Sequence, residues 1–106
     1  MMAWVEVGRT DEFLPGTHRV VEAGGTFIAV FNLDGNFYAI EDICTHDGGE
    51  LTGGTVEGDE VICPRHGARF CIKTGNALTP PAYEPTAAFP VVVEDGVIRT
   101  RDDRWD

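Results

Sequence analysis

The sequence predicts an all-β protein, a small antiparallel β-sandwich or barrel base with an inserted subdomain. Apolar, β-branched and aromatic residues gather in short segments of strand length, and no long segment has helical periodicity. The pairs Asp34-Gly35 and Asp95-Gly96 separate such segments, and Asp-Gly is a favoured two-residue turn of antiparallel hairpins. A chain of 106 residues is long enough for one domain with one modest core.

The N-terminal part should supply the first strands of this base. Strands are expected over Trp4–Val7 and His18–Glu22, with a single helical turn over Thr10–Leu14 between them. The helical turn has a polar start, and Pro15-Gly16 stops it. Thr26–Leu33 is almost wholly apolar, which predicts a central strand.

The remaining strands are expected to lead into and out of the subdomain. The Asp34-Gly35 turn joins the central strand to a partner over Asn36–Asp42. Further strands are predicted over Glu60–Cys63, Ala68–Ile72, Phe89–Glu94 and Val97–Thr100. The last two form a hairpin that should rejoin the first strands and close the base.

Two Cys/His pairs stand out in the chain. Cys44-Thr45-His46 is followed, sixteen residues after its histidine, by Cys63-Pro64-Arg65-His66. Two soft thiolates and two imidazoles can hold metals at tetrahedral sites. A [2Fe-2S] cluster with Cys on one iron and His on the other uses this donor set.

Three other interpretations of the pairs are open. Zinc sites also mix Cys and His, but they usually pair like residues as C-x2–4-C or H-x3–5-H. A disulfide is disfavoured because the acidic chain has no signal peptide, which points to a reducing compartment. The residues could also be buried thiols and surface histidines without a metal. Cys71, the third cysteine, is expected to be a small buried core residue.

The pairs and their surroundings resemble the Rieske family, and the resemblance covers nearly the whole chain. Beyond the pairs it rests on Gly48-Gly49, Pro64, Gly67, Lys73-Thr74-Gly75 and Thr79-Pro80-Pro81. The resemblance implies that Cys44 and Cys63 bind the buried iron of one [2Fe-2S] cluster. It likewise implies that His46 and His66 bind the outer iron.

The resemblance also implies a domain organisation. Residues 1–106 would form a single Rieske domain, with a base over 1–42 and 86–106 and a cluster-binding subdomain over 43–85. In the family, a proline-bearing loop shields the cluster. Pro80 and Pro81 suit such a loop, because their fixed φ leaves little freedom.

Residues around the ligands suggest a low reduction potential. High-potential relatives join the two ligand loops with extra cysteines, where this chain has Gly49 and Arg65. They also place Ser and Tyr hydroxyls where this chain has Ala68 and Phe70. Fewer hydrogen-bond donors stabilise the reduced cluster less, so the potential should be lower.

Charge and composition restrict the partners. The net charge of −10 and the absence of a basic stripe argue against nucleic acid. No apolar run approaches the ~20 residues of a membrane span, and the N-terminus lacks signal-peptide features, so a soluble cytoplasmic protein is expected. Glu41 to Glu60 contains seven acids and no Lys or Arg. That run is interpreted either as a solvated surface or as steering toward a basic partner.

The function implied by the resemblance is one-electron transfer and not catalysis. No nucleophile–base constellation is visible, and a soluble Rieske ferredoxin would pass electrons from a flavoprotein reductase to a terminal Rieske oxygenase that dihydroxylates aromatic rings. It would dock transiently through the tip at His46 and His66 and is expected to be a monomer. The alternatives are the small subunit of a nitrite reductase, a carrier for another cytoplasmic redox system and, more remotely, a zinc-held interaction module.

Overall fold

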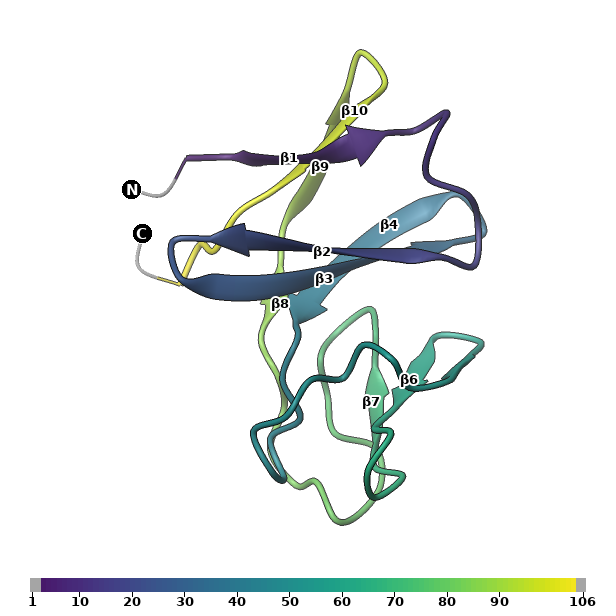
Figure 1. Cartoon of the computed structure of the whole chain (residues 1–106), viewed down its shortest axis with the longest axis vertical. Helices are drawn as coiled ribbons and strands as arrows, with labels where there is room; N and C mark the ends of the chain where they lie inside the picture. Colours follow the sequence, from purple (N-terminus) through teal and green to yellow (C-terminus); the bar gives the residue numbers. More distant parts are fainter. Residues whose placement is uncertain (1–2, 105–106) are drawn as a thin grey trace.

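The computed structural model describes residues 3–104, whose strands form three antiparallel sheets (Figure 1). The strand orders are β1-β10-β9, β2-β3-β4-β8 and β5-β6-β7. The strands are β1 (Val5–Arg9), β2 (His18–Ala23), β3 (Thr26–Leu33), β4 (Asn36–Glu41), β5 (Val56–Glu57), β6 (Glu60–Ile62), β7 (Arg69–Cys71), β8 (Ala88–Phe89), β9 (Val91–Glu94) and β10 (Val97–Thr100). No helix occurs within residues 3–104, and the predicted all-β class is confirmed.

Both Asp-Gly pairs form the tight turns that the sequence predicts. Asp34 has φ of 55° and Gly35 of 91°, and they join β3 to β4 with Leu33 opposite Asn36. The second pair has φ of 52° and 76° and joins β9 to β10. Positive φ at both central residues is the requirement of a type I′ turn, and its twist matches that of the flanking strands.

The helical turn predicted over Thr10–Leu14 is wrong, because the segment forms irregular turns between β1 and β2. Phe13 is buried, and its carbonyl oxygen accepts a hydrogen bond from Asn32 Nδ2 at 2.7 Å. The backbone N–H of Gly16 donates to the carbonyl oxygen of Asn32 at 2.9 Å. One helical turn offers too few hydrogen bonds to persist alone, so these contacts with β3 determine the path.

The strand predicted over Phe89–Glu94 is divided between two sheets. Its first part belongs to β8, which pairs with β4, while β9 pairs with β10. Pro90 lies between the two strands and has no N–H to donate to a ladder. The C-terminal strand β10 pairs with β1, so the last hairpin does rejoin the first strand as predicted.

The middle of β3 is buried on both faces, and the core on one of these faces contains the paired cysteines. Ile28 and Val30 belong to the core between the sheets β1-β10-β9 and β2-β3-β4-β8. Ala29 and Phe31, which point the other way, belong to a second core that includes both paired cysteines. A strand segment that is buried on both faces must be apolar, which explains the apolar run over residues 28–31.

The second core joins β3 and β4 to the lobe at the lower end of Figure 1, which carries β6 and β7 and their loops. This lobe is inserted between β4 and β8 in the sequence. The limits 1 and 106 of the predicted domain lie outside the described residues. The described residues contain no helix that is both long enough and apolar enough to span a bilayer.

A buried carboxylate fastens the C-terminal segment to the base. Asp102 is buried and accepts hydrogen bonds from Thr26 Oγ1 at 2.8 Å and from Arg104 Nη2 at 2.8 Å. Arg104 also donates to Glu41 Oε1 at 3.0 Å, at the end of β4. The bonds from Arg104 hold the pKa of the Asp102 carboxyl well below its usual range.

Replacing Asp102 with Asn is expected to lower the free energy of unfolding at pH 7 by about 1–3 kcal/mol, since it removes charge-assisted hydrogen bonds to a buried group. The carboxyl pKa is lower in the folded state than its unfolded value of about 3.9, so its stabilisation is present above that pH and is lost as pH falls. The free energies of unfolding of the two proteins in urea should therefore differ at pH 7, and the difference should shrink progressively as pH falls below about 4. A difference that grows on acidification would contradict this role.

Candidate metal centre

The paired cysteines lie side by side inside the second core. Cys44 follows β4 and Cys63 follows β6, and their side chains are 0% and 1% exposed. Their sulfur atoms and a carboxylate oxygen of Asp47 all lie within 4.8 Å of one another. Burial raises the pKa of the Cys44 thiol, although backbone N–H groups of His46 and Asp47 donate to it and act in the opposite direction.

The two loops that carry these cysteines have the same local structure. In each, the cysteine N–H donates to the carbonyl oxygen five residues later, at 2.7 Å to Gly49 and at 2.7 Å to Ala68. Each cysteine carbonyl oxygen also accepts from the N–H of a glycine four residues later. Those glycines, Gly48 and Gly67, have φ of 76° and 75°, a conformation that L side chains rarely adopt. The two Cys/His segments therefore adopt the same loop conformation.

The two imidazoles lie together at the surface. The ring centroids of His46 and His66 are 5.0 Å apart, and the rings are nearly perpendicular at 86°. Both residues are exposed, and the His66 side chain keeps 55% of its accessible surface. The four predicted ligands thus form a buried thiol pair and an exposed imidazole pair.

The separation of the two pairs bears on which metal they suit. One tetrahedral ion with bonds of 2.0–2.3 Å needs all four donor atoms within about 4 Å of one another. Among residues 3–104, the group of donors within 4.8 Å joins the two sulfurs to Asp47 and includes neither imidazole. Thiols on one metal and imidazoles on a second suit this arrangement better than a single zinc ion does.

An ion pair that sequence reasoning missed joins the two loops. Arg65 Nε donates to Asp47 Oδ2 at 2.5 Å, and Arg65 Nη2 donates to Asp47 Oδ1 at 3.1 Å. The guanidinium holds the pKa of the Asp47 carboxyl well below its usual range, and the carboxylate raises the pKa of Arg65. The sequence shows that each of these residues is adjacent to a predicted ligand histidine, but it does not show their contact.

Asp42 is a second residue that the sequence did not single out. Its side chain is buried, and Oδ1 accepts from the N–H groups of Leu51 at 2.9 Å and Thr52 at 2.8 Å. Oδ2 accepts from Thr52 Oγ1 at 2.6 Å. Asp42 therefore ties together the two ends of the segment that carries Cys44 and His46. Its partners lie nine and ten residues away, so no local pattern reveals the role.

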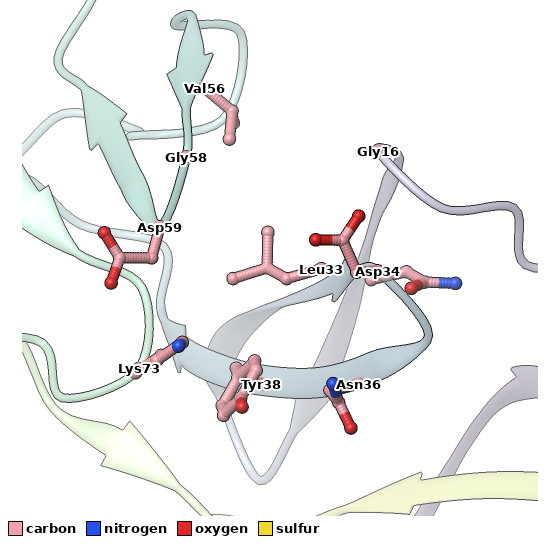
Figure 2. Close-up of a pocket in the computed structure, with 10 residues that line it drawn as sticks. Gly16, Leu33, Asp34, Asn36, Tyr38, Val56, Gly58, Asp59 and Lys73 are labelled. Atoms are coloured by element: carbon pink, nitrogen blue, oxygen red, sulfur yellow. The ribbon is translucent and has the colours of Figure 1, made fainter.

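Cys71 and one surface hollow are not part of the group formed by the paired cysteines and histidines. Cys71 is half-buried in β7, not fully buried as predicted. The hollow has a volume of about 660 Å³, and Figure 2 shows Tyr38, Asp59 and Lys73 around it. None of the paired Cys or His residues lines it, so it is not part of the metal centre.

Comparisons with known proteins agree with this fold and donor set. The profile of the Rieske [2Fe-2S] domain matches residues 3–90. The biphenyl dioxygenase ferredoxin subunit of Pseudomonas sp. (strain KKS102) is 37% identical, over 88% of this chain and 86% of the relative.

Two solved structures are similar over nearly the whole chain. The ferredoxin of carbazole 1,9a-dioxygenase from Nocardioides aromaticivorans IC177 has a TM-score of 0.89 and 28% identity, with 95% of this chain and 99% of that chain covered. A complex of reduced oxygenase and oxidized ferredoxin in carbazole 1,9a-dioxygenase contains a chain with a TM-score of 0.88 and 36% identity, covering 92% of each chain.

The fold and these similarities define an iron–sulfur protein that carries electrons. The chain belongs to the Rieske [2Fe-2S] domain family. Within that family it is a Rieske-type ferredoxin of the group found in aromatic dioxygenase systems, an electron carrier and not an enzyme.

Proposed function

We propose that this chain passes single electrons from a flavoprotein reductase to the terminal oxygenase of an aromatic-ring dioxygenase, as a cytoplasmic monomer. The proposed ligands are Cys44 and Cys63 on the inner iron and His46 and His66 on the outer iron of one [2Fe-2S] cluster. The proposed organisation is a base over 1–42 and 86–106 with a cluster-binding subdomain over 43–85. The observation that carries the proposal is a buried thiol pair beside an exposed imidazole pair.

The donor set fits the cluster that the family carries. Two thiolates in a dry core and two imidazoles at the surface match a cluster with chemically different irons. Backbone N–H groups that donate to the Cys44 sulfur would stabilise negative charge there. When bound, the cluster accepts and releases one electron.

The residues around the proposed cluster would exclude water from its cysteine side and contact the partner on its histidine side. The core around Cys44 and Cys63 keeps water from the thiolates. The exposed rings of His46 and His66 give a partner the shortest approach to the centre. The relative seen in complex with an oxygenase supports docking to such a partner here.

An exposed aromatic residue on the proline-bearing loop supports the same docking face. Tyr83 is 80% exposed and follows the Pro80-Pro81 segment. Thr45 Oγ1 donates to the carbonyl oxygen of Glu84 at 2.6 Å, which holds this proline-bearing loop against the first ligand loop. Exposed aromatic residues are common anchors of protein interfaces.

The reduction potential should lie at the low end of the Rieske range. Ala68 and Phe70 are fully buried in the core that contains the thiols, and neither has a hydroxyl to donate. We expect a midpoint at or below about 0 mV, within a range of about −150 to +300 mV for Rieske centres. A redox titration that gives a clearly positive midpoint would contradict the assignment to the low-potential group.

The test of the whole proposal is electron paramagnetic resonance of the purified protein after reduction with dithionite. The expected result is a rhombic signal from a cluster with mixed Cys and His ligands. Reoxidation of the reduced protein by an aromatic dioxygenase oxygenase should then be fast and saturable. A colourless sample with stoichiometric zinc would refute electron transfer. A normal cluster that no oxygenase oxidises would instead refute the proposed partner.

A further inference from the structure

The Asp47–Arg65 ion pair is the charged contact between the two ligand loops. The loops, Cys44–Gly49 and Cys63–Ala68, close by hydrogen bonds within themselves. In the described part of the chain, the hydrogen bonds that cross between them are those of this ion pair and the contact between the two thiols. Apart from the apolar core that they share, the loops therefore have few contacts to keep them in register before a metal joins them.

The geometry of the pair is that of a fixed clamp and not of a loose surface ion pair. Both carboxylate oxygens accept from the planar guanidinium, at 2.5 and 3.1 Å. Asp47 Oδ1 also accepts from the N–H of Gly49 at 2.9 Å, so the carboxylate is oriented by its own loop. Bidentate pairs with an oriented partner are the ones that contribute more than exposed ion pairs usually do.

Gly49 makes room for this clamp. A Cβ atom at Gly49 would lie 2.5 Å from Arg65 Cζ and 2.6 Å from Arg65 Nη2, closer than real contacts allow. The guanidinium therefore lies directly over the backbone of the first loop. Only glycine at this position permits that approach without displacing Arg65.

The clamp also lies beside the proposed ligands. Asp47 follows His46 and Arg65 precedes His66, so each member is covalently next to an imidazole. Asp47 Oδ2 is 3.6 Å from His66 Nδ1 on the opposite loop. Any movement of the pair would therefore change the spacing between the two loops at the histidines.

We propose that Asp47, Gly49 and Arg65 form an inter-loop clamp that holds both ligand loops at the spacing the cluster needs and so limits cluster loss. This inference rests on the proposed ligand set. The three residues are positioning residues, since none is proposed to bind a metal. Their effect should be on retention of the cluster and on local motion of the loops, with little effect on global stability.

The test compares cluster loss in the presence of a chelator, followed by visible absorbance, for wild type and variants. Arg65→Gln is expected to lose the cluster at least about tenfold faster, as is typical when groups that orient metal ligands are removed. Arg65→Lys should recover only part of the loss, because an ammonium cannot form the two-pronged contact. Gly49→Ala should also accelerate loss, although it leaves both charges in place.

Arg69→Gln is the matched control. Arg69 forms ion pairs with Glu57 at 3.0 Å and Glu60 at 3.3 Å in the same subdomain, but it does not join the ligand loops. This variant should retain the cluster like wild type. Equal acceleration in Arg69→Gln, or a rate for Arg65→Gln equal to wild type, would overturn the clamp.

A second measurement separates the clamp from the proposed function. In metal-free protein, hydrogen exchange of the four loop amides that close the loops, those of Cys44, Gly48, Cys63 and Gly67, should be about tenfold faster in Arg65→Gln. This result needs no cluster, so it stands even if the wild-type protein gives no Rieske spectrum. Unchanged exchange at these amides would refute the clamp and leave the ligand set untouched.

Discussion

Replacing Cys63 with serine is expected to abolish cluster binding, the largest effect that any single substitution should have on this protein. The thiolate is one of two soft donors proposed for the inner iron, and a hydroxyl is a poor substitute for it. The Cys63 side chain is 1% exposed within the second core, so a water molecule could not easily take the place of the thiolate on the iron. Iron and sulfide content should fall to near zero, and the reduced protein should give no rhombic signal.

Cys71→Ser is the control for this substitution. This control makes the same Cys-to-Ser change at Cys71 in strand β7. Cys71 is not a member of either core. It should keep full iron content and the wild-type spectrum. A Cys63→Ser protein that retains its iron, or a Cys71→Ser protein that loses it, would contradict the proposed ligand set.

Replacing Asp42 with alanine is expected to cost about 3 kcal/mol or more of the free energy of unfolding. Asp42 accepts three hydrogen bonds, and alanine would leave the N–H groups of Leu51 and Thr52 without their acceptor. Leu51 is fully buried, so its N–H could form a hydrogen bond with water only if the core rearranged. A buried donor without a partner costs about 1–3 kcal/mol.

Thermal unfolding of the metal-free protein measures this effect. The melting temperature of Asp42→Ala should fall by about 12–24 °C, given the usual 4–8 °C per kcal/mol for a domain of this size. Asp42→Asn keeps one oxygen that can accept from both N–H groups, so it should lose less. Glu50→Ala removes an exposed acid from the same segment and should change little. Equal melting temperatures for Asp42→Ala and Glu50→Ala would rule out the structural role of Asp42.

The acidic run from Glu41 to Glu60 is more structural than its composition suggests. Asp42 accepts hydrogen bonds inside the fold, and the other acids that form ion pairs are Glu41 with Arg104, Asp47 with Arg65, and Glu57 and Glu60 with Arg69. Five of the seven acids are thus held by partners within the chain. Asp42 accepts from neutral groups and keeps its negative charge, whereas the other four acids share three arginines. The ion pairs therefore weaken, without removing, the field with which the run could steer a basic partner.

Local patterns in the sequence were sufficient for most of the strands and for the ligand candidates, but not for β5 or for the division between β8 and β9. The length of apolar segments and the Asp-Gly turns predicted the β3–β4 and β9–β10 hairpins, because hairpin formation depends on residues that are adjacent in the chain. The Cys and His residues were visible for a similar reason, since their chemistry is rare and their spacing within each pair is short. Glycine four residues after each cysteine also belongs to this local information.

Contacts between distant segments decided the rest. The predicted helical turn failed because Asn32 on β3 binds the backbone of Phe13, nineteen residues earlier. Asp42, Asp102 and the Asp47–Arg65 pair owe their roles to partners that only the folded chain brings near, across 9, 76 and 18 positions. An isolated carboxylate or guanidinium is the same in any sequence. Its partner, burial and pKa are set by the tertiary structure, because desolvation and hydrogen bonding depend on which segments meet in space.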